Sequence, residues 1–60
     1  MAKFWMVVVE GGSAPNARHP AIDTARKEAA RLAASTGRKA IVLEAIESCE
    51  PISNVVWEKV

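Results

Sequence analysis

The sequence is short of the residues that usually stabilise a very small domain. Cys49 is the only cysteine and His19 is the only histidine among its 60 residues. A single cysteine excludes a disulfide within the chain, and the two residues together fall short of a His/Cys zinc cluster. A chain of this size buries only roughly 60% of its unfolded surface, so a lone copy would be marginally stable. We therefore expect self-association to supply the missing stability.

An excess of charge of one sign is also missing. Eight basic and seven acidic residues give a formal net charge of +1, which provides no bulk attraction for nucleic acid or an anionic membrane. The apolar run Phe4–Val9 is six residues long, whereas a membrane helix needs about 20 and a signal-peptide core about 7–15. These shortages predict a soluble, cytoplasmic protein. Half of the residues are hydrophobic, which argues against disorder.

One segment, residues 20–36, has clear helical periodicity. Pro20 suits a first helical turn, and Asp23 fits either a cap one turn later or a charge near the positive helix end. Gly37 suits the left-handed position that follows a helix. Six residues, all apolar except the last, fall on one face. They are Ile22, Ala25, Ala29, Leu32, Ala33 and Thr36. The pattern predicts an amphipathic helix whose narrow, mostly alanine stripe can lie close to a sheet.

Three segments have the composition of strands: residues 3–10, 39–48 and 55–60. Residues 11–19 are rich in turn formers and form a long strand-to-helix loop, and residues 49–54 are predicted to form a turn. The order β-α-β-β predicts an α+β fold with a three-stranded sheet and one helix on one of its faces. We expect a right-handed crossover between the first two strands and an antiparallel hairpin between the last two. The favoured strand order is 1-3-2, and the alternative is 1-2-3.

The first strand is apolar on both faces, since Phe4, Met6 and Val8 alternate with Trp5, Val7 and Val9. Such a strand is normally covered on both faces, and one helix covers only one of them. We therefore expect the single domain, residues 1–60, to form a homodimer, either by continuing the sheet at its edge or by stacking through Trp5 and Trp57. The alternative for the aromatic residues is simple core packing. The candidate interface residues are Phe4, Trp5, Val7, Val9 and Trp57.

Several short runs along the middle of the chain occur together in this order. They are Arg18-His19-Pro20, Ala25, Glu28-Ala29, Arg31-Leu32-Ala33 and Val42-Leu43-Glu44-Ala45. In this arrangement residues 17–46 resemble a group of short phage and prophage proteins of uncharacterised function. The resemblance implies a phage-type origin, a β-α-β-β fold and a place in the host bacterial cytoplasm, and it supplies no catalytic residues. Ala21 stands where a capping threonine is expected.

Basic residues around the helix form a second candidate site, for nucleic acid or a small anion. They are Arg18, His19, Arg26, Lys27, Arg31, Arg38 and Lys39. Arg18 and His19 precede the helix start, where free amides favour an anion, and residues 11–13 are near them in sequence. No GxxxxGK or GxGxxG pattern accompanies them, and the alternative is that they anchor the loop. The whole set resembles a stripe for phosphate backbones, but Asp23 and Glu28 interrupt it, and a solvated helix face is the alternative.

No catalytic pattern is recognisable in the sequence. Cys49 and His19 have the chemistry of a nucleophile and a base, but nothing in the sequence brings them together. We therefore expect neither a cofactor nor a metal, and no enzyme activity. The leading hypothesis is a phage-type, homodimeric interaction module that binds a host or phage protein. The alternative is a nucleic-acid-binding accessory protein, whose binding would weaken with salt.

Overall fold

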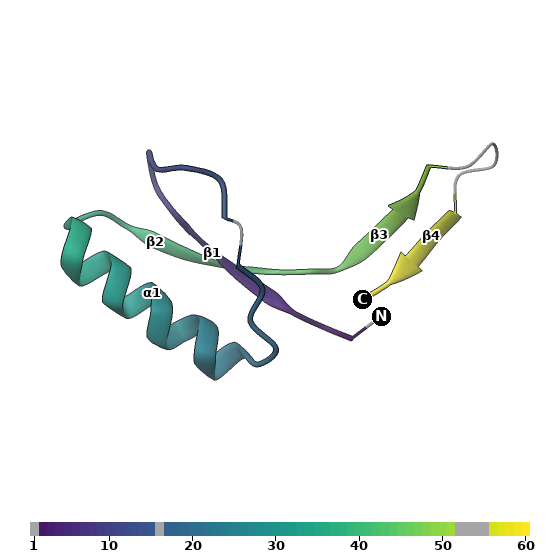
Figure 1. Cartoon of the computed structure of the whole chain (residues 1–60), viewed down its shortest axis with the longest axis horizontal. Coiled ribbons are helices and arrows are strands. Elements are labelled where there is room, and N and C mark those ends of the chain that lie inside the picture. The colour runs from purple at the N-terminus through teal and green to yellow at the C-terminus, as the bar shows by residue number, and fades with distance from the viewer. Residues whose placement is uncertain (1, 16, 52–55) are drawn as a thin grey trace.

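The computed structural model describes residues 2–15, 17–51 and 56–60. Along the chain, the elements are β1 (Trp5–Val9), α1 (Ile22–Thr36), β2 (Ala40–Glu44), β3 (Glu47–Glu50) and β4 (Val56–Lys59) (Figure 1). The predicted α+β class is confirmed. In place of the single three-stranded sheet, the described strands form two antiparallel pairs, β1 with β2 and β3 with β4.

The first pair corrects the favoured strand order. β1 and β2 are direct neighbours, with a register that runs from Trp5 opposite Glu44 to Val9 opposite Ala40. The order 1-3-2 is therefore wrong, and so is the right-handed crossover, which would make the two strands parallel. Of the two orders considered, 1-2-3 comes nearer, because the third predicted strand does pair with part of the second.

The long loop before the helix explains why β1 and β2 are antiparallel. Gly11 has a φ of 78° and allows a tight turn in which the Gly12 N–H donates to the Val9 carbonyl at 2.8 Å. The chain then returns along β1 until His19 lies opposite Trp5, where the two residues exchange backbone hydrogen bonds of 2.9 and 2.8 Å. Because the loop brings the chain back to the start of β1, the helix runs in the same direction as β1. The chain after the helix then runs in the opposite direction, so β2 is antiparallel to β1.

The helix ends where the sequence predicts and starts two residues later. Ala21 is the N-cap residue, with φ −136° and ψ 145°, and its side chain makes no capping hydrogen bond. Asp23 lies in the first turn, where its charge faces the positive end of the helix dipole. At the other end, Gly37 adopts the left-handed conformation at φ 68°, and its N–H donates to the Ala33 carbonyl at 2.9 Å. No described helix has the length and apolar character needed to cross a membrane.

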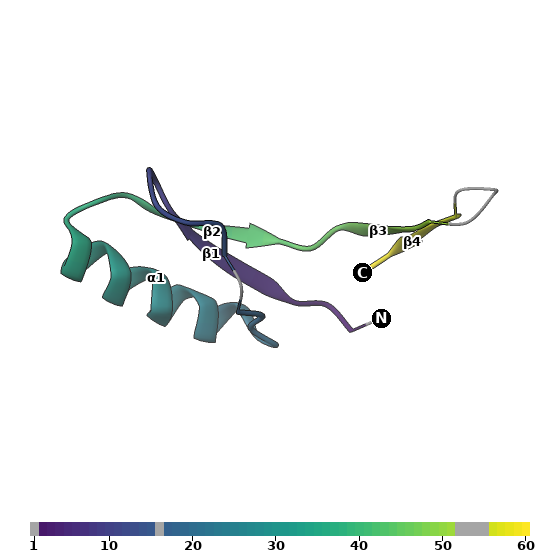
Figure 2. The same ribbon diagram turned by 45° about the horizontal axis from the view of Figure 1, so that its top comes forward.

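The helix covers one face of the β1–β2 pair with its alanine stripe (Figure 2). Ala25 is completely buried, and Ala29 and Val7 are 9% and 8% exposed. Trp5, Leu32, Ala40 and Val42 pack against these three and are only partly buried. Among the described residues these three are the whole buried core, so the contact is close but small.

The pair β3–β4 projects from this unit instead of packing on it. The predicted strand 39–48 is interrupted after Glu44, and its last residues belong to β3, which extends to Glu50. The predicted turn 49–54 therefore begins later, and its residues 52–54, with the first residue of predicted strand 55–60, lie outside the described residues. The chain measures 44 × 23 × 13 Å, with a radius of gyration of 13.7 Å. A compact protein of 60 residues has a radius of gyration of about 10 Å.

Candidate interaction surface

The helix-covered face of the first sheet contains three of the five predicted interface residues. Trp5, Val7 and Val9 alternate with the outward-facing residues of β1, and Val7 is part of the buried core under α1. Val7 is therefore a core residue, which corrects the expectation that it lies at an interface. Both faces of β1 are apolar, so the alternation itself gave no basis for choosing which face the helix would cover.

The opposite face of this sheet points away from α1. We call this surface the open sheet face. Its residues are Phe4, Met6, Val8, Ile41 and Leu43. Leu43 and Ile41 are 43% and 39% exposed, and Met6 and Val8 are partly buried. Among the described residues, no helix or strand packs against this face. It is a contiguous apolar surface of the kind that usually marks an interaction site.

One edge of the open sheet face is covered by the returning loop. The Arg18 guanidinium carbon lies 4.4 Å from the centre of the Phe4 ring, which is a cation–π contact. His19 pairs with Trp5, which lies on the helix-covered face. Because neighbouring residues of an extended segment point to opposite faces, the side chain of Arg18 points to the open sheet face. Of the predicted interface residues in and beside β1, Phe4 is thus the one that lies on the open sheet face.

The second part of the candidate surface is the hairpin, meaning β3 and β4 with the flanking residues Ile46 and Val60. Val60 N–H donates to the Ile46 carbonyl at 2.8 Å and extends the pairing by one residue. Trp57 is 64% exposed and Ile46 is 65% exposed. Among the described residues the hairpin strands pack on neither α1 nor the β1–β2 sheet. An isolated two-stranded hairpin is at best marginally stable in water.

The register of the hairpin gives it two different sides. Cys49 lies opposite Trp57, and Glu47 lies opposite Lys59, so these four residues share one side. Cys49 is a free thiol and is exposed. This side has a central aromatic residue and a pair of opposite charges one step away, an arrangement typical of an interface centre and its polar rim.

The total accessible surface supports the same description. The chain exposes 4569 Å² for a mass of 6.5 kDa, whereas a compact monomer of this mass exposes about 3,800 Å². The excess of about 770 Å² is close to the roughly 800 Å² that each partner buries in a standard protein–protein interface.

The predicted anion site at Arg18 and His19 is not assembled. Both backbone groups of His19 bind Trp5, at the start of β1, and the Arg18 side chain lies over Phe4. The glycines expected to complete the site follow the opposite end of β1, about 13 Å away along the strand. The Arg18–His19 segment therefore anchors the loop, as the alternative interpretation expected.

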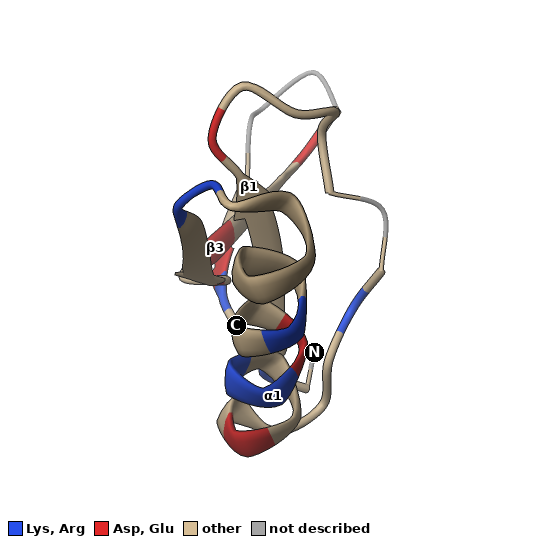
Figure 3. Ribbon diagram, turned by 90° about the vertical axis from the view of Figure 1, so that its left-hand side faces the viewer, with Lys and Arg blue, Asp and Glu red and all other residues tan. Residues whose placement is uncertain are grey.

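The basic residues of the helix do not form one continuous stripe (Figure 3). Arg31 Nε donates to Glu28 Oε1, one helical turn away, at 2.5 Å. This hydrogen bond holds the pKa of Glu28 below its usual range and raises the pKa of Arg31, and the nearby His19 also lowers the pKa of Glu28 to a smaller extent. One of the predicted phosphate contacts is thus already paired with a carboxylate.

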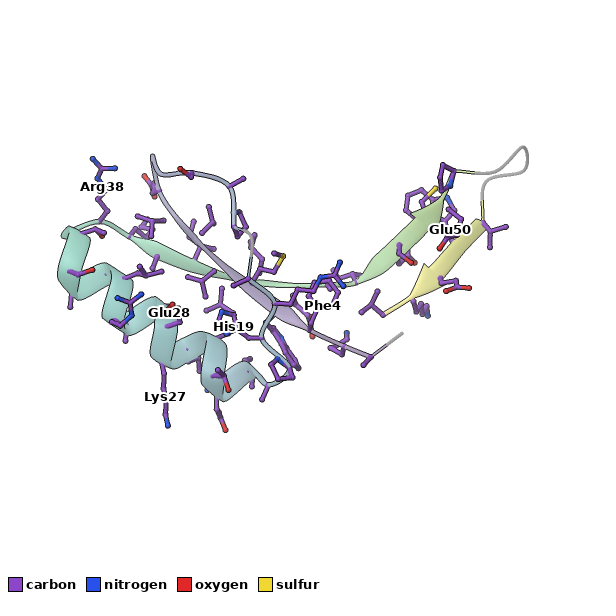
Figure 4. The ribbon with its side chains drawn as sticks, in the orientation of Figure 1. Phe4, His19, Lys27, Glu28, Arg38 and Glu50 are labelled. Atoms are coloured by element: carbon purple, nitrogen blue, oxygen red, sulfur yellow. The ribbon has the colours of Figure 1, made fainter. Side chains whose placement is uncertain are left out.

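The remaining basic residues point in different directions. Lys39 Nζ lies 4.0 Å from Glu10 Oε2, and Arg38 extends to the turn at Gly11. Lys27 points away from the sheet, at a distance from Arg38 (Figure 4). Arg26 is exposed on α1, whereas Arg18 lies on the open sheet face. The predicted nucleic-acid set is therefore dispersed over several surfaces.

The two residues with nucleophile and base chemistry are also separated. His19 lies beside β1, and Cys49 lies in the hairpin, which does not pack on that sheet. In the described parts of the chain, no three His, Cys, Asp or Glu side chains are grouped as a metal site, and no pocket is formed.

Sequence reasoning missed most of the open sheet face: Met6, Val8, Ile41 and Leu43. The alternation correctly grouped Met6 with Val8 and Ile41 with Leu43, and it showed that one helix cannot cover both faces of the sheet. No signal in the sequence indicated which face stays uncovered. No protein-family model, curated protein or solved structure matches the chain. The resemblance of residues 17–46 to short phage proteins therefore stays a prediction.

Proposed function

We propose that this chain is a small interaction module that acts as a homodimer and binds a protein partner without catalysing a reaction. The observation that carries the proposal is the hairpin, which holds Trp57 and Ile46 in solvent with no support from the rest of the described chain. Since such a hairpin needs a packing partner to be stable, contact with another molecule is part of the fold.

The small core supports the dimer. A contact built mainly on two alanines and one valine buries too little apolar area to stabilise a 60-residue domain comfortably. A second copy that covered the open sheet face and the hairpin would add the area that one copy lacks. The excess accessible surface of the single chain is enough for one standard interface.

A route for binding a further partner is the outer edge of β2. The Lys39 carbonyl accepts from the Glu10 N–H, and the Ala45 N–H donates to the Phe4 carbonyl. The alternate residues, Ala40, Val42 and Glu44, therefore direct their backbone groups to the other edge. Among the described strands none pairs with this edge. An extended peptide segment of a partner could add to it as a further strand. The phage resemblance is the reason to seek that partner among host and phage proteins in the bacterial cytoplasm.

The first test is the mass in solution. Sedimentation equilibrium at tens of micromolar should give twice the chain mass of 6.5 kDa. A mass of one chain at that concentration would overturn the homodimer. Capture from bacterial lysate with tagged dimer, compared with the tag alone, should then enrich a discrete protein. A low-salt gel shift with DNA and RNA tests the alternative function, and we expect no complex because the basic residues are dispersed and partly paired.

A further inference from the structure

We infer that the two copies exchange their hairpins, so that the hairpin of each copy lies across the open sheet face of the other. This inference rests on the homodimer proposed above and specifies its geometry. It identifies the occupant of the open sheet face as the Trp57 side of the partner's hairpin, and the support of each hairpin as the partner's sheet.

The occupant is a second copy because both unmet requirements belong to the same chain. Each copy has one apolar sheet face that no described helix or strand covers, and one hairpin that carries an exposed Trp57 and packs on no other described element. A two-fold axis brings the hairpin of the first copy to the face of the second and, by the same operation, the hairpin of the second to the face of the first. Stacking two open faces would leave both hairpins bare, and pairing two hairpins would leave both faces bare.

The hairpin does not reach the open face of its own chain. Only residues 45 and 46 separate β2 from β3, and the hairpin continues away from the first sheet (Figures 1 and 2). Val8 lies opposite Ile41, and Ile41 is eight residues from Cys49 along an extended chain, a distance of about 26 Å. A hairpin extended in this way is in position to pack on another molecule.

The two surfaces are chemically suited to each other. Trp57 provides a large, rigid apolar side chain, and Met6 on the open face is an adaptable partner for an aromatic ring. Val8, Ile41 and Leu43 complete an apolar floor, and the charge of Arg18 lies at its edge, over Phe4. The Glu47–Lys59 pair on the same side of the hairpin would then lie at the edge of the contact, where charges remain hydrated.

The native thiol of Cys49 makes this geometry testable. A Val8→Cys, Cys49→Ser double variant carries its only thiol on the open face, and the unmodified chain carries its only thiol on the hairpin. When the two proteins are mixed in equal amounts and oxidised, any bond between these thiols must join two copies. A disulfide needs Cα atoms within about 7 Å, so the mixed bond forms efficiently only if the hairpin lies on the partner's face.

The matched control is a Lys27→Cys, Cys49→Ser variant, whose thiol lies on the outer surface of α1. Non-reducing electrophoresis and mass spectrometry of tryptic peptides should show the mixed bond as the main product for position 8, at least about tenfold above the yield for position 27. Circular dichroism should show that both variants keep the fold.

Two results would overturn the exchange and leave the homodimer intact: a dimer by sedimentation that forms bonds only between two position-8 thiols, or equal yields of mixed bonds at positions 8 and 27. A monomer by sedimentation, with no mixed bond above the control, would overturn both the exchange and the homodimer.

Discussion

Replacing Trp57 with alanine is the sharpest test of whether the hairpin is an interaction element. In the single chain, 64% of this side chain is exposed. A tryptophan buries up to about 250 Å², so roughly 160 Å² is available for a partner. At about 25 cal/mol per Å² this corresponds to about 4 kcal/mol for each side chain. Alanine keeps the Cβ and the interface covers the ring incompletely, so we expect a loss of at least about 2 kcal/mol in dimerisation free energy.

A loss of this size weakens the dimer at least about thirtyfold. Sedimentation equilibrium over a range of concentrations measures the dissociation constant directly, and thermal unfolding gives a second reading, because the melting temperature of a dimer rises with concentration. Trp57→Ala should lower the melting temperature, and the melting temperature should change little with concentration wherever the concentration is below the raised dissociation constant.

Ile22→Ala is the control, since Ile22 is also an exposed large apolar residue, at 39%, but lies at the start of α1. This variant should dimerise as the unmodified chain does. The reasoning would be refuted if Trp57→Ala left the dissociation constant unchanged, or if Ile22→Ala weakened the dimer equally.

Three further predictions concern the helix and its contacts. Ala25→Leu should cost about 1–3 kcal/mol, because Ala25 is fully buried against the sheet and extra atoms have no room. Urea unfolding should show this loss, whereas Ala30→Leu on the exposed side of α1 should be close to neutral, and equal effects would contradict the packing. Ala21→Ser should stabilise the protein by about 0.5–2 kcal/mol, because it adds an acceptor at an N-cap that has no side-chain hydrogen bond; an unchanged or lower melting temperature would count against it. Glu28→Gln should remove a small stabilisation that exists because the hydrogen bond from Arg31 lowers the pKa of Glu28. A lowered folded-state pKa gives stabilisation above the ordinary value of 4.5, and this stabilisation is lost as the pH falls through the folded-state value. The unfolding free energies of the two proteins should therefore converge in acid. A difference that grew with falling pH would contradict the Glu28–Arg31 pair.

The helix is the element that the sequence specified best. Gly37 marked its end because glycine enters the left-handed conformation without steric cost, and the alanine stripe marked the buried side at Ala25 and Ala29. The start was off by two residues, because Pro20 and Ala21 give competing local signals and neither offers a capping side chain.

The candidate interface was recoverable only in part. Counting apolar positions showed that one helix leaves a face of the sheet uncovered, and Phe4 and Trp57 were among the residues selected for an interface. Trp5, Val7 and Val9 were selected for the interface as well, because an unbroken apolar run has no polar alternation to show which of its faces the helix covers. The structure separates the residues of the anion candidate for a related reason: residues 11–13 and His19 are near one another in sequence but lie at opposite ends of β1.

The sequence by itself determined the local elements: one alanine-striped helix with a glycine end, strands on either side of it, an antiparallel hairpin at the end of the chain, and more apolar strand surface than one helix can cover. These follow from propensity and periodicity, which act over a few residues. Only the tertiary structure decided that the loop returns along β1, that β2 therefore runs antiparallel beside it, and that Met6, Val8, Ile41 and Leu43 form the uncovered face. Those choices depend on backbone pairing between residues as far apart as Trp5, His19 and Glu44, and no local pattern records which distant edge a strand will meet.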